Sequence, residues 1–217
     1  MINIVFEGAP GAGKTTIVAA IVLRLKKYGI KVGKTIDIDP ANPLYPILHN
    51  MNNNTPLVTS KANFNTVLYE TFLQVSDYLY SREKIMAQEN EINIFDRAYF
   101  SVYAYQKVLL KEKYGEACNC LLDNLLETLK FSNKKIDLVF YFIDKNNVYL
   151  NRAQQRDNMK FTDYEIKTLN LFEKELTSII QKEKDYEIIY IVNEELNITT
   201  EKIFKKIIDY YELRREK

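Results

Sequence analysis

Short, uninterrupted apolar runs alternate along this chain with longer stretches in which apolar residues recur at helical spacing. Four runs are typical of strands buried on both faces: Ile2 to Phe6, Ile92 to Phe95, Leu138 to Ile143 and Ile188 to Val192; Lys31 to Ile36 is a weaker fifth. The helical stretches are Lys14 to Tyr28, Asn63 to Gln88, Phe100 to Lys113, Glu116 to Phe131, Asn147 to Arg156, Asp163 to Lys184 and Thr200 to Arg214. This alternation predicts a doubly wound α/β fold, with a central five-stranded parallel sheet flanked by helices.

One segment, from Pro40 to Ser60, interrupts the alternation. Four prolines and the run Asn52 to Asn54 favour loop over regular structure there. Strong helical periodicity resumes afterwards, so we interpret residues 40–60 as an insertion over an acceptor site and expect a single domain over residues 1–217. His49 lies in this segment and is expected to be a loop residue rather than a catalyst.

Composition narrows the classes of protein. Of the 217 residues, 47% are hydrophobic, which is enough for a substantial core. The formal net charge of +1 provides no global positive field, so no nucleic-acid or anionic-lipid partner is expected. No apolar run approaches the ~18 residues of a membrane span. Cys118 and Cys120 are too close in sequence for an ordinary disulfide, which favours reduced thiols in a cytoplasmic protein.

The first predicted strand runs into a phosphate-binding motif. Residues Gly8 to Thr15, GAPGAGKT, match G-x-x-x-x-G-K-[ST] between a strand and a helix. The glycines permit positive φ angles, so successive backbone N–H groups can surround a phosphate at the helix N-terminus. Lys14 would reach the β- and γ-phosphates, and the Thr15 hydroxyl would ligate Mg²⁺. The residues expected to contact the nucleotide are Gly8, Gly11, Ala12, Gly13, Lys14, Thr15 and Thr16.

Two further pairs of charged residues belong to the same predicted edge of the sheet. Asp96 and Arg97 follow the strand Ile92 to Phe95, where a carboxylate can hold Mg²⁺ and a guanidinium can clamp a phosphate. Arg152 and Arg156 are four residues apart on one helical face, within a segment of about 145–162. Two guanidiniums on such a lid could stabilise charge on a phosphoryl group in transfer.

Two motifs together resemble the thymidylate kinases. One is FEG followed by GKTT, within Phe6 to Thr16; the other is DRAYFSVYAYQ, Asp96 to Gln106, similar to the family's DR-Y-x-x-S-x-x-AYQ with its tyrosine one place later. Looser likeness extends over most of the chain, including the arginine-bearing lid and a final loop beside adenine. The resemblance implies a P-loop NTPase fold and Mg²⁺- and ATP-dependent phosphoryl transfer to dTMP. It also implies dimerisation through helices on one face of the sheet.

The same resemblance implies roles for individual residues. It implies that Asp96 orients the metal or the acceptor and that Arg97 binds the phosphate of the acceptor. Further acceptor contacts are expected from Tyr99, Ser101, Tyr105 and Gln106, and an adenine contact from Asn193.

The acceptor itself stays open, because the chain departs from the thymidylate kinase pattern. Pro10 stands where the family carries an acidic residue that contacts the acceptor's sugar, and no arginine lies around Gln74 to Asp77 on the helix before the DR strand. Deoxynucleoside kinases also begin with a hydrophobic-Glu-Gly sequence, in which the glutamate takes the proton of the 5′-hydroxyl. Glu7 has that position and Asp39-Pro40 is similar to their acid-proline pair. Glu7 could equally be a structural carboxylate.

We therefore expect an ATP-dependent nucleotide kinase, with a deoxynucleoside or other small-molecule hydroxyl kinase as the alternative. A monophosphate acceptor needs little base catalysis, whereas a hydroxyl acceptor needs a base. A regulatory P-loop ATPase is less favoured, since the chain has no N-K-x-D motif and a switch has no use for an arginine-bearing lid. A kinase-like fold that only binds nucleotide is also less favoured, because Lys14, Thr15, Asp96 and Arg97 are all present.

Overall fold

The computed structural model of the protein describes residues 1–36, 39–54, 67–132, 136–143, 148–158, 160–192 and 195–215, without the side chains of residues 51–54 and 157. Its centre is a five-stranded parallel sheet in the order β2-β3-β1-β4-β5. The strands are β1 (Ile2–Gly8), β2 (Val32–Lys34), β3 (Ile92–Asp96), β4 (Leu138–Ile143) and β5 (Glu187–Val192). The predicted α/β fold with five parallel strands is confirmed.

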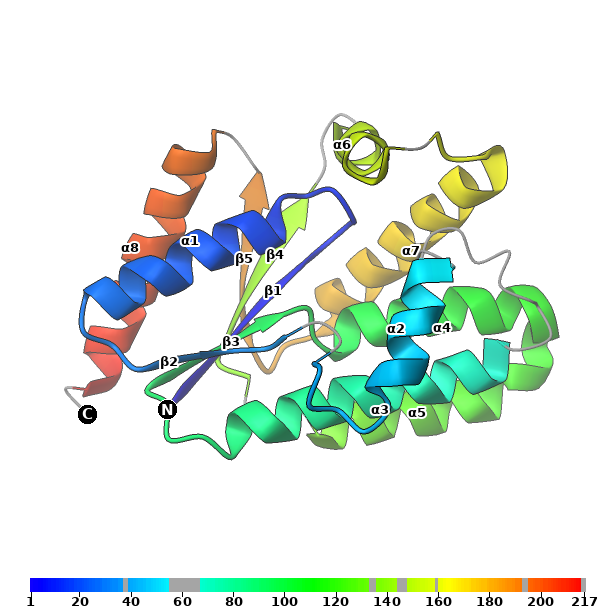
Figure 1. Ribbon diagram of the computed structural model, residues 1–217, viewed down its shortest axis with the longest axis horizontal. Helices are drawn as coiled ribbons and strands as arrows, with labels where there is room; N and C mark the ends of the chain where they lie inside the picture. Colours follow the sequence, from blue (N-terminus) through cyan, green and yellow to red (C-terminus); the bar gives the residue numbers. More distant parts are fainter. Residues whose placement is uncertain are drawn as a thin grey trace.

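The helices form two layers, one on each face of the sheet (Figure 1). One layer consists of α1 (Lys14–Lys27) and α8 (Leu196–Arg215). The other consists of α3 (Val67–Met86), α4 (Tyr99–Tyr114), the short 3₁₀ helix η1 (Gly115–Cys118), α5 (Asn119–Ser132) and α7 (Asp163–Lys182). Helix α6 (Val148–Asp157) lies beyond the carboxyl end of β4, at the top of Figure 1.

Side chains of β1 alternate between these two layers. Ile2, Ile4 and Phe6 belong to the apolar cluster shared with α1 and α8. Val5 belongs to the cluster on the opposite face, and since successive strand residues point to opposite faces, Glu7 is directed to that face too. Strand β1 therefore ends with a carboxylate under helix α4, while every residue of the strand is buried.

The segment interpreted as a loop over residues 40–60 contains a helix, α2 (Tyr45–Asn54), so the loop prediction was wrong there and His49 is a helical residue. Pro46 lies in the first turn, where its missing N–H costs no helical hydrogen bond. The Asn42 side chain also accepts the Leu44 N–H at 2.9 Å just before the helix begins. Of the residues that favoured a loop, Pro46 thus lies in the first turn of α2 and Asn52 to Asn54 lie at its end.

The chain before α2 is fastened to one stripe of α3. Asp39, 5% exposed, pairs with Lys84 at 2.5 Å. The Tyr80 hydroxyl donates to the Ala41 carbonyl at 2.7 Å, and Asn42 Nδ2 donates to Asp77 Oδ1 at 2.6 Å. Asp39, the acid of the Asp-Pro pair, is thus engaged by helix α3.

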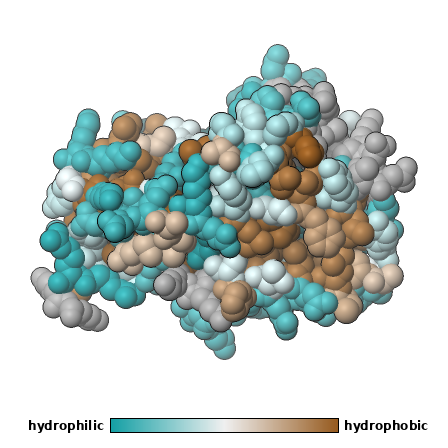
Figure 2. All heavy atoms as spheres, turned by 60° about the horizontal axis from the view of Figure 1, so that its bottom comes forward, coloured by the Kyte–Doolittle hydropathy of each residue, from teal (hydrophilic) through white to brown (hydrophobic). Residues whose placement is uncertain are grey.

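Three exposed apolar side chains, Leu68, Tyr69 and Phe72, lie close together in sequence on α3, and Phe131 is an exposed aromatic residue of α5. The face brought forward in Figure 2 carries its larger continuous hydrophobic area in the right half, whereas hydrophilic and hydrophobic atoms are mixed in the left half. Exposed apolar areas of this kind are typical of interaction surfaces, but the homodimer stays a prediction. Among the described residues, no helix is long and apolar enough to cross a membrane.

Helix α8 is fastened at the amino end of the sheet. The Glu91 carboxylate accepts the Lys31 N–H at 2.9 Å and also the Tyr211 hydroxyl of α8. Arg214 donates to Asp137 at 2.9 Å. The backbone N–H of Lys31 and then the Tyr211 hydroxyl lower the pKa of Glu91.

This anchor predicts a pH-dependent contribution to stability. Because the folded-state pKa of Glu91 is lowered, its contribution is present above the ordinary value of 4.5 and is lost as the pH falls through the lowered pKa. Glu91→Gln should reduce Tm at pH 7 by at most about 2–4 °C. In thermal unfolding monitored by circular dichroism, this difference should shrink below pH 4.5.

Glu89→Gln is the matched control, because Glu89 is exposed and makes no hydrogen bond with the described residues. A Tm difference for Glu91→Gln that persisted unchanged at acidic pH would contradict the assigned role.

Candidate active site

The phosphate-binding loop lies between β1 and α1 and has the conformation that its glycines permit. Gly8, Gly11 and Gly13 have φ angles of 144°, 81° and 81°. Gly13 occupies the N-cap of α1 in a left-handed conformation, and Lys14 begins the helix. The helix therefore presents its N-terminal N–H groups and its positive dipole end to the concave side of the loop.

Lys14 is buried at the centre of the loop, with 5% of its surface exposed. Its Nζ donates to the carbonyls of Gly8 and Ala9 at 2.9 and 2.8 Å. Burial lowers the pKa of Lys14 well below its ordinary value; the positive charges of Arg97 and Arg156 lower it further, while Asp96 and Glu7 raise it. A polyphosphate beside Nζ would stabilise the charged ammonium and so raise the pKa of Lys14 again. Lys14 is therefore placed to pair with an anion.

Thr15 and Asp96 together present a hydroxyl and a carboxylate beside the loop. The Thr15 hydroxyl donates to Asp96 Oδ2 at 2.7 Å, and the Asp96 N–H is held by the Thr35 hydroxyl at 3.1 Å. Oxygen ligands of these kinds suit Mg²⁺. No group of three or more His, Cys, Asp or Glu among the described residues could hold a metal. The two side chains therefore fit a Mg²⁺ ion that takes its other ligands from phosphate and water.

Arg97 has an unusual backbone conformation for a residue with a side chain, with φ at 77°. Its N–H donates to the Phe6 carbonyl at 2.9 Å, which ties the end of β3 to β1. Its Nη1 donates to Ser101 Oγ at 2.9 Å and to the Gly8 carbonyl at 3.2 Å. Nε and Nη2 have no hydrogen-bond partner among the described residues. The fixed guanidinium can thus still bind an anion.

Glu7 is completely buried and holds the start of α4. One carboxylate oxygen accepts the N–H groups of Ala98, at 2.7 Å, and of Ser101, at 3.3 Å. The other accepts the Ser101 hydroxyl. Burial raises the pKa of Glu7, although Arg97, the hydrogen bonds of Ser101 and Ala98, and Lys14 act in the opposite direction. Glu7 therefore serves as an N-cap supplied by another element, and through Ser101 it also fixes Arg97.

A pocket of about 110 Å³ opens beside Arg97 and Ser101. Its other lining residues come from the phosphate loop, α3, α4 and α7: Pro10, Gln74, Val102, Tyr105, Leu169 and Phe172. The rings of Tyr105 and Phe172 meet edge to face, with centroids 5.9 Å apart. No acidic side chain is among the described residues that line it. The pocket is thus apolar, with one cation at the end next to the loop.

Gln74 is the amide of the pocket wall, and buried Gln106 stands behind it. The two amides contact each other at 3.3 Å, and Gln106 also contacts the Thr71 hydroxyl at 2.7 Å. The Thr71 hydroxyl also lies 2.8 Å from the Val67 carbonyl, so its single proton is shared between Val67 and Gln106 Oε1. Gln106 Nε2 donates to Gln74 Oε1, which leaves the Gln74 amide nitrogen for the pocket.

Helix α6 rests directly on the phosphate loop. A Cβ atom added to Gly11 would lie 2.1 Å from the Tyr149 carbonyl oxygen and 3.0 Å from the Ala153 nitrogen. The charge of Arg156 acts on Lys14 across this contact. Arg152 is exposed and makes no hydrogen bond or ion pair with the described residues. The predicted lid is therefore packed on the loop. Arg156 is close enough to Lys14 for its charge to act on that residue.

The structure brings most of the predicted site residues to one edge of the sheet, but not all of them. Tyr99 is fully buried against Phe100, with ring centroids 4.1 Å apart, and does not line the pocket. Gln106 stands one residue behind the pocket wall. Asn193 lies outside the described residues.

Sequence reasoning missed the pocket residues of α3, α4 and α7, Gln74, Val102, Leu169 and Phe172. Their helical spacing indicated a buried face but gave no signal that the face opens on a cavity.

This combination of a phosphate loop, an edge carboxylate, a lid helix on the loop and an adjoining pocket defines a P-loop kinase. The thymidylate kinase family model matches residues 6–203, so the chain belongs to the thymidylate kinase family, whose members are ATP-dependent nucleotide kinases. A relative from Sulfurisphaera tokodaii, described as a "Probable thymidylate kinase", is 33% identical over 178 residues, covering 82% of this chain and 81% of the relative. The fold is also similar to deoxyadenosine kinase from M. mycoides with bound dATP, with a TM-score of 0.66 at 19% identity over 95% of this chain and 99% of the other.

The contact between Gly11 and α6 predicts that Gly11→Ala weakens nucleotide binding, because the new methyl group would collide with the Tyr149 backbone. Nucleotide affinity measured by calorimetry should fall by at least about tenfold, the effect of roughly 1.4 kcal/mol. Gly29→Ala is the matched control: Gly29 has a similar φ of 87°, but a Cβ there would meet nothing within 4 Å.

Both variants share the backbone strain of about 1–2 kcal/mol. Only Gly11→Ala adds the collision, so equal nucleotide affinities for the two would show that α6 does not constrain the loop.

Proposed function

We propose that this protein transfers the γ-phosphoryl group of Mg²⁺-bound ATP to a deoxynucleoside monophosphate, with dTMP as the acceptor. The family supports nucleotide phosphorylation in general, and its description supports dTMP in particular. ATP would lie with its phosphates in the loop from Gly8 to Thr15, and the acceptor would occupy the apolar pocket beside Arg97.

The chain's own residues would act mainly by positioning and by neutralising charge. Lys14 and the loop N–H groups would hold the β- and γ-phosphates, while Arg97 would hold the acceptor phosphate in line with them. Arg156, with Arg152 on the same helix, would stabilise charge on the transferred group. Thr15 and Asp96 would hold the Mg²⁺ ion, which neutralises phosphate charge when bound.

The observation that carries the proposal is the engagement of Glu7. A base for a hydroxyl acceptor must reach that hydroxyl directly or through one water. Glu7 is 0% exposed, accepts three hydrogen bonds from Ala98 and Ser101, and does not line the pocket. This arrangement favours a monophosphate acceptor, whose phosphate oxygen is already a nucleophile, over a nucleoside.

The pocket also supports a pyrimidine-sized base between apolar walls. Tyr105 and Phe172 offer aromatic surface, and Gln74 offers an amide whose partner Gln106 fixes its orientation. The Gln74 oxygen accepts from Gln106, so the Gln74 amide nitrogen would donate a hydrogen bond to a ring carbonyl, such as one of thymine. Pro10, next to Arg97 in the lining, provides no hydrogen-bond acceptor side chain for the sugar, so Arg97 and the base contacts would carry acceptor binding.

The direct test is a panel of nucleosides and their 5′-monophosphates incubated with Mg²⁺ and ATP, with ADP release as the measurement. We expect turnover with dTMP, at a kcat/KM at least about a hundredfold above that with thymidine, because only the monophosphate reaches Arg97 with a charge. An acceptor-free reaction measures background hydrolysis. Turnover with nucleosides alone would overturn the proposal in favour of a nucleoside kinase. Turnover with neither would also overturn it, in favour of another hydroxyl acceptor or a regulatory ATPase with a protein partner.

Glu7→Gln separates the two acceptor chemistries within one chain. A glutamine retains one carbonyl acceptor for the α4 N–H groups, so we expect loss of stability and a decrease in kcat of less than about tenfold. Loss of a general base costs about 10²–10⁴ in rate. A decrease of that size in a Glu7→Gln variant whose circular dichroism spectrum is unchanged would mean that Glu7 is the base.

A further inference from the structure

We propose that Leu169 couples occupancy of the acceptor pocket to the position of the lid helix α6, so that the two substrates bind cooperatively. The inference rests on the proposed function, because it assigns the pocket to the acceptor. It adds a positioning residue that contacts the acceptor side and acts on the nucleotide side through the lid.

Leu169 belongs to two groups of residues at once. It lines the acceptor pocket together with Phe172, one helical turn further along α7. It is also one of three buried residues in a separate small apolar cluster, together with Ala153 of α6 and Phe161 of the turn before α7. Leu169 itself is 7% exposed. Among the described residues, it is the only one that belongs to both the pocket lining and this cluster.

On the lid side, the small cluster holds α6 to the start of α7. The Phe161 N–H donates to Gln154 Oε1 of α6 at 2.9 Å. Thr162 and Glu165 then form a capping box that begins α7. Ala153 is fully buried, and its backbone nitrogen, together with the Tyr149 carbonyl, is among the groups that a Cβ on Gly11 of the phosphate loop would meet. Movement of α7 near Leu169 would therefore be passed to α6 and to the loop.

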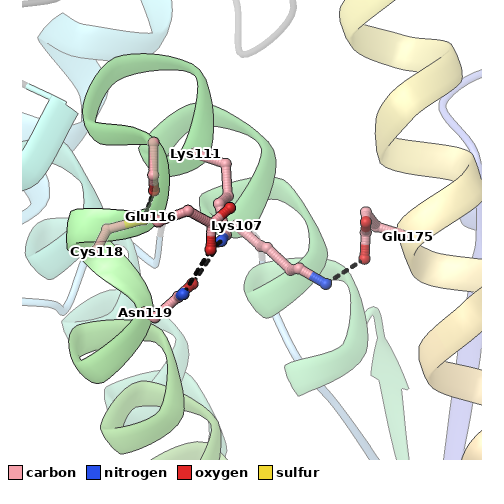
Figure 3. A network of polar contacts seen from close by, with 7 residues as sticks. Lys107, Lys111, Glu116, Cys118, Asn119 and Glu175 are labelled. Atoms are coloured by element: carbon pink, nitrogen blue, oxygen red, sulfur yellow. Dashed lines mark hydrogen bonds and ion pairs between the residues drawn. The ribbon is translucent and has the colours of Figure 1, made fainter.

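On the pocket side, α7 is held to α4, which carries Ser101 and Tyr105. Lys107 of α4 pairs with Glu175 of α7 at 2.6 Å, as Figure 3 shows. The Tyr164 hydroxyl of α7 donates to Glu112 of α4 at 2.8 Å. Because these contacts flank Leu169 along α7, an acceptor that fills the pocket would press on a restrained helix. Because α7 is held on both sides of Leu169, the Leu169 side chain would then shift toward Phe161 and Ala153.

This arrangement has a thermodynamic consequence. If the acceptor stabilises the packing of Leu169 on the lid cluster, it stabilises the lid position that brings Arg156 toward the phosphates. The nucleotide, by holding α6, must then increase acceptor affinity by the same factor. The proposal therefore predicts reciprocal cooperativity that depends on the Leu169 contacts.

The experiment measures four dissociation constants by calorimetry with the full chain: a non-hydrolysable Mg²⁺-bound ATP analogue with and without saturating dTMP, and dTMP with and without the analogue. For the unmodified protein we expect each ligand to tighten the other by the same factor, at least about fivefold. Phe161→Leu replaces the ring that packs against Leu169 in the lid cluster with a smaller side chain, and Phe161 does not line the pocket. It should leave the affinity for dTMP alone within about twofold and reduce the coupling factor to below about two.

Two further variants complete the design. Leu169→Ala should lower dTMP affinity and remove the coupling, because it removes apolar atoms from both the pocket lining and the lid cluster. Leu176→Ala is the matched control, since Leu176 is also a buried leucine of α7 but belongs to the core cluster against the sheet, and neither lines the pocket nor belongs to the lid cluster. It should lower thermal stability and leave the coupling factor unchanged.

The outcomes separate this inference from the proposed function. Independent binding of dTMP and the analogue to the unmodified protein, or full coupling in Phe161→Leu, would overturn the role of Leu169 while dTMP turnover still supported the function. If the acceptor panel identifies another monophosphate, the same four constants are measured with that compound. If no monophosphate is bound or phosphorylated, the function fails, and this inference fails with it.

Discussion

The buried carboxylate of Glu7 is the interaction on which the active-site edge depends. It ends strand β1 and accepts both N–H groups and the hydroxyl at the start of α4. A carboxylate buried without such partners would be costly, and N–H groups at a helix start would cost about 1–3 kcal/mol each if left unpaired. The three hydrogen bonds satisfy the carboxylate and the N–H groups together. They also fix Ser101, and hence the guanidinium of Arg97, at the mouth of the pocket.

The phosphate loop and the proposed acceptor pocket share a wall. Pro10 belongs to the phosphate loop and lines the acceptor pocket. Gly8 is approached by the Phe142 backbone of β4 and Gly11 by the Tyr149 backbone near the start of α6. Since glycine is the residue that tolerates both the positive φ angles and these contacts, the loop accommodates phosphate on one side and protein backbone on the other. The conformation of the phosphate loop therefore depends on how α6 is packed against it.

The phosphate loop matches its sequence motif completely, whereas the proposed acceptor pocket is built from side chains of three helices as well as the loop. The thymidylate kinase family match spans residues 6–203, and the phosphate loop keeps every residue of its motif. Among the described residues, the lining of the proposed acceptor pocket includes no acidic side chain, and Gln74 lies in its wall. A phosphate loop must satisfy one fixed anion, whereas an acceptor pocket can bind similar ligands through different side chains.

The sequence by itself determined the strands, the phosphate loop and the strand-end pair Asp96 and Arg97, because these depend on local patterns: apolar runs, glycine spacing and the residues that follow each strand. It misassigned the segment now known to contain α2, since Pro46 and the nearby asparagines fit a loop and a helix start equally well. Only the tertiary structure decided that Glu7 is saturated by α4, that Tyr99 is core and that Leu169 lies between pocket and lid. Those roles arise from contacts between residues distant in sequence, which no local spacing encodes.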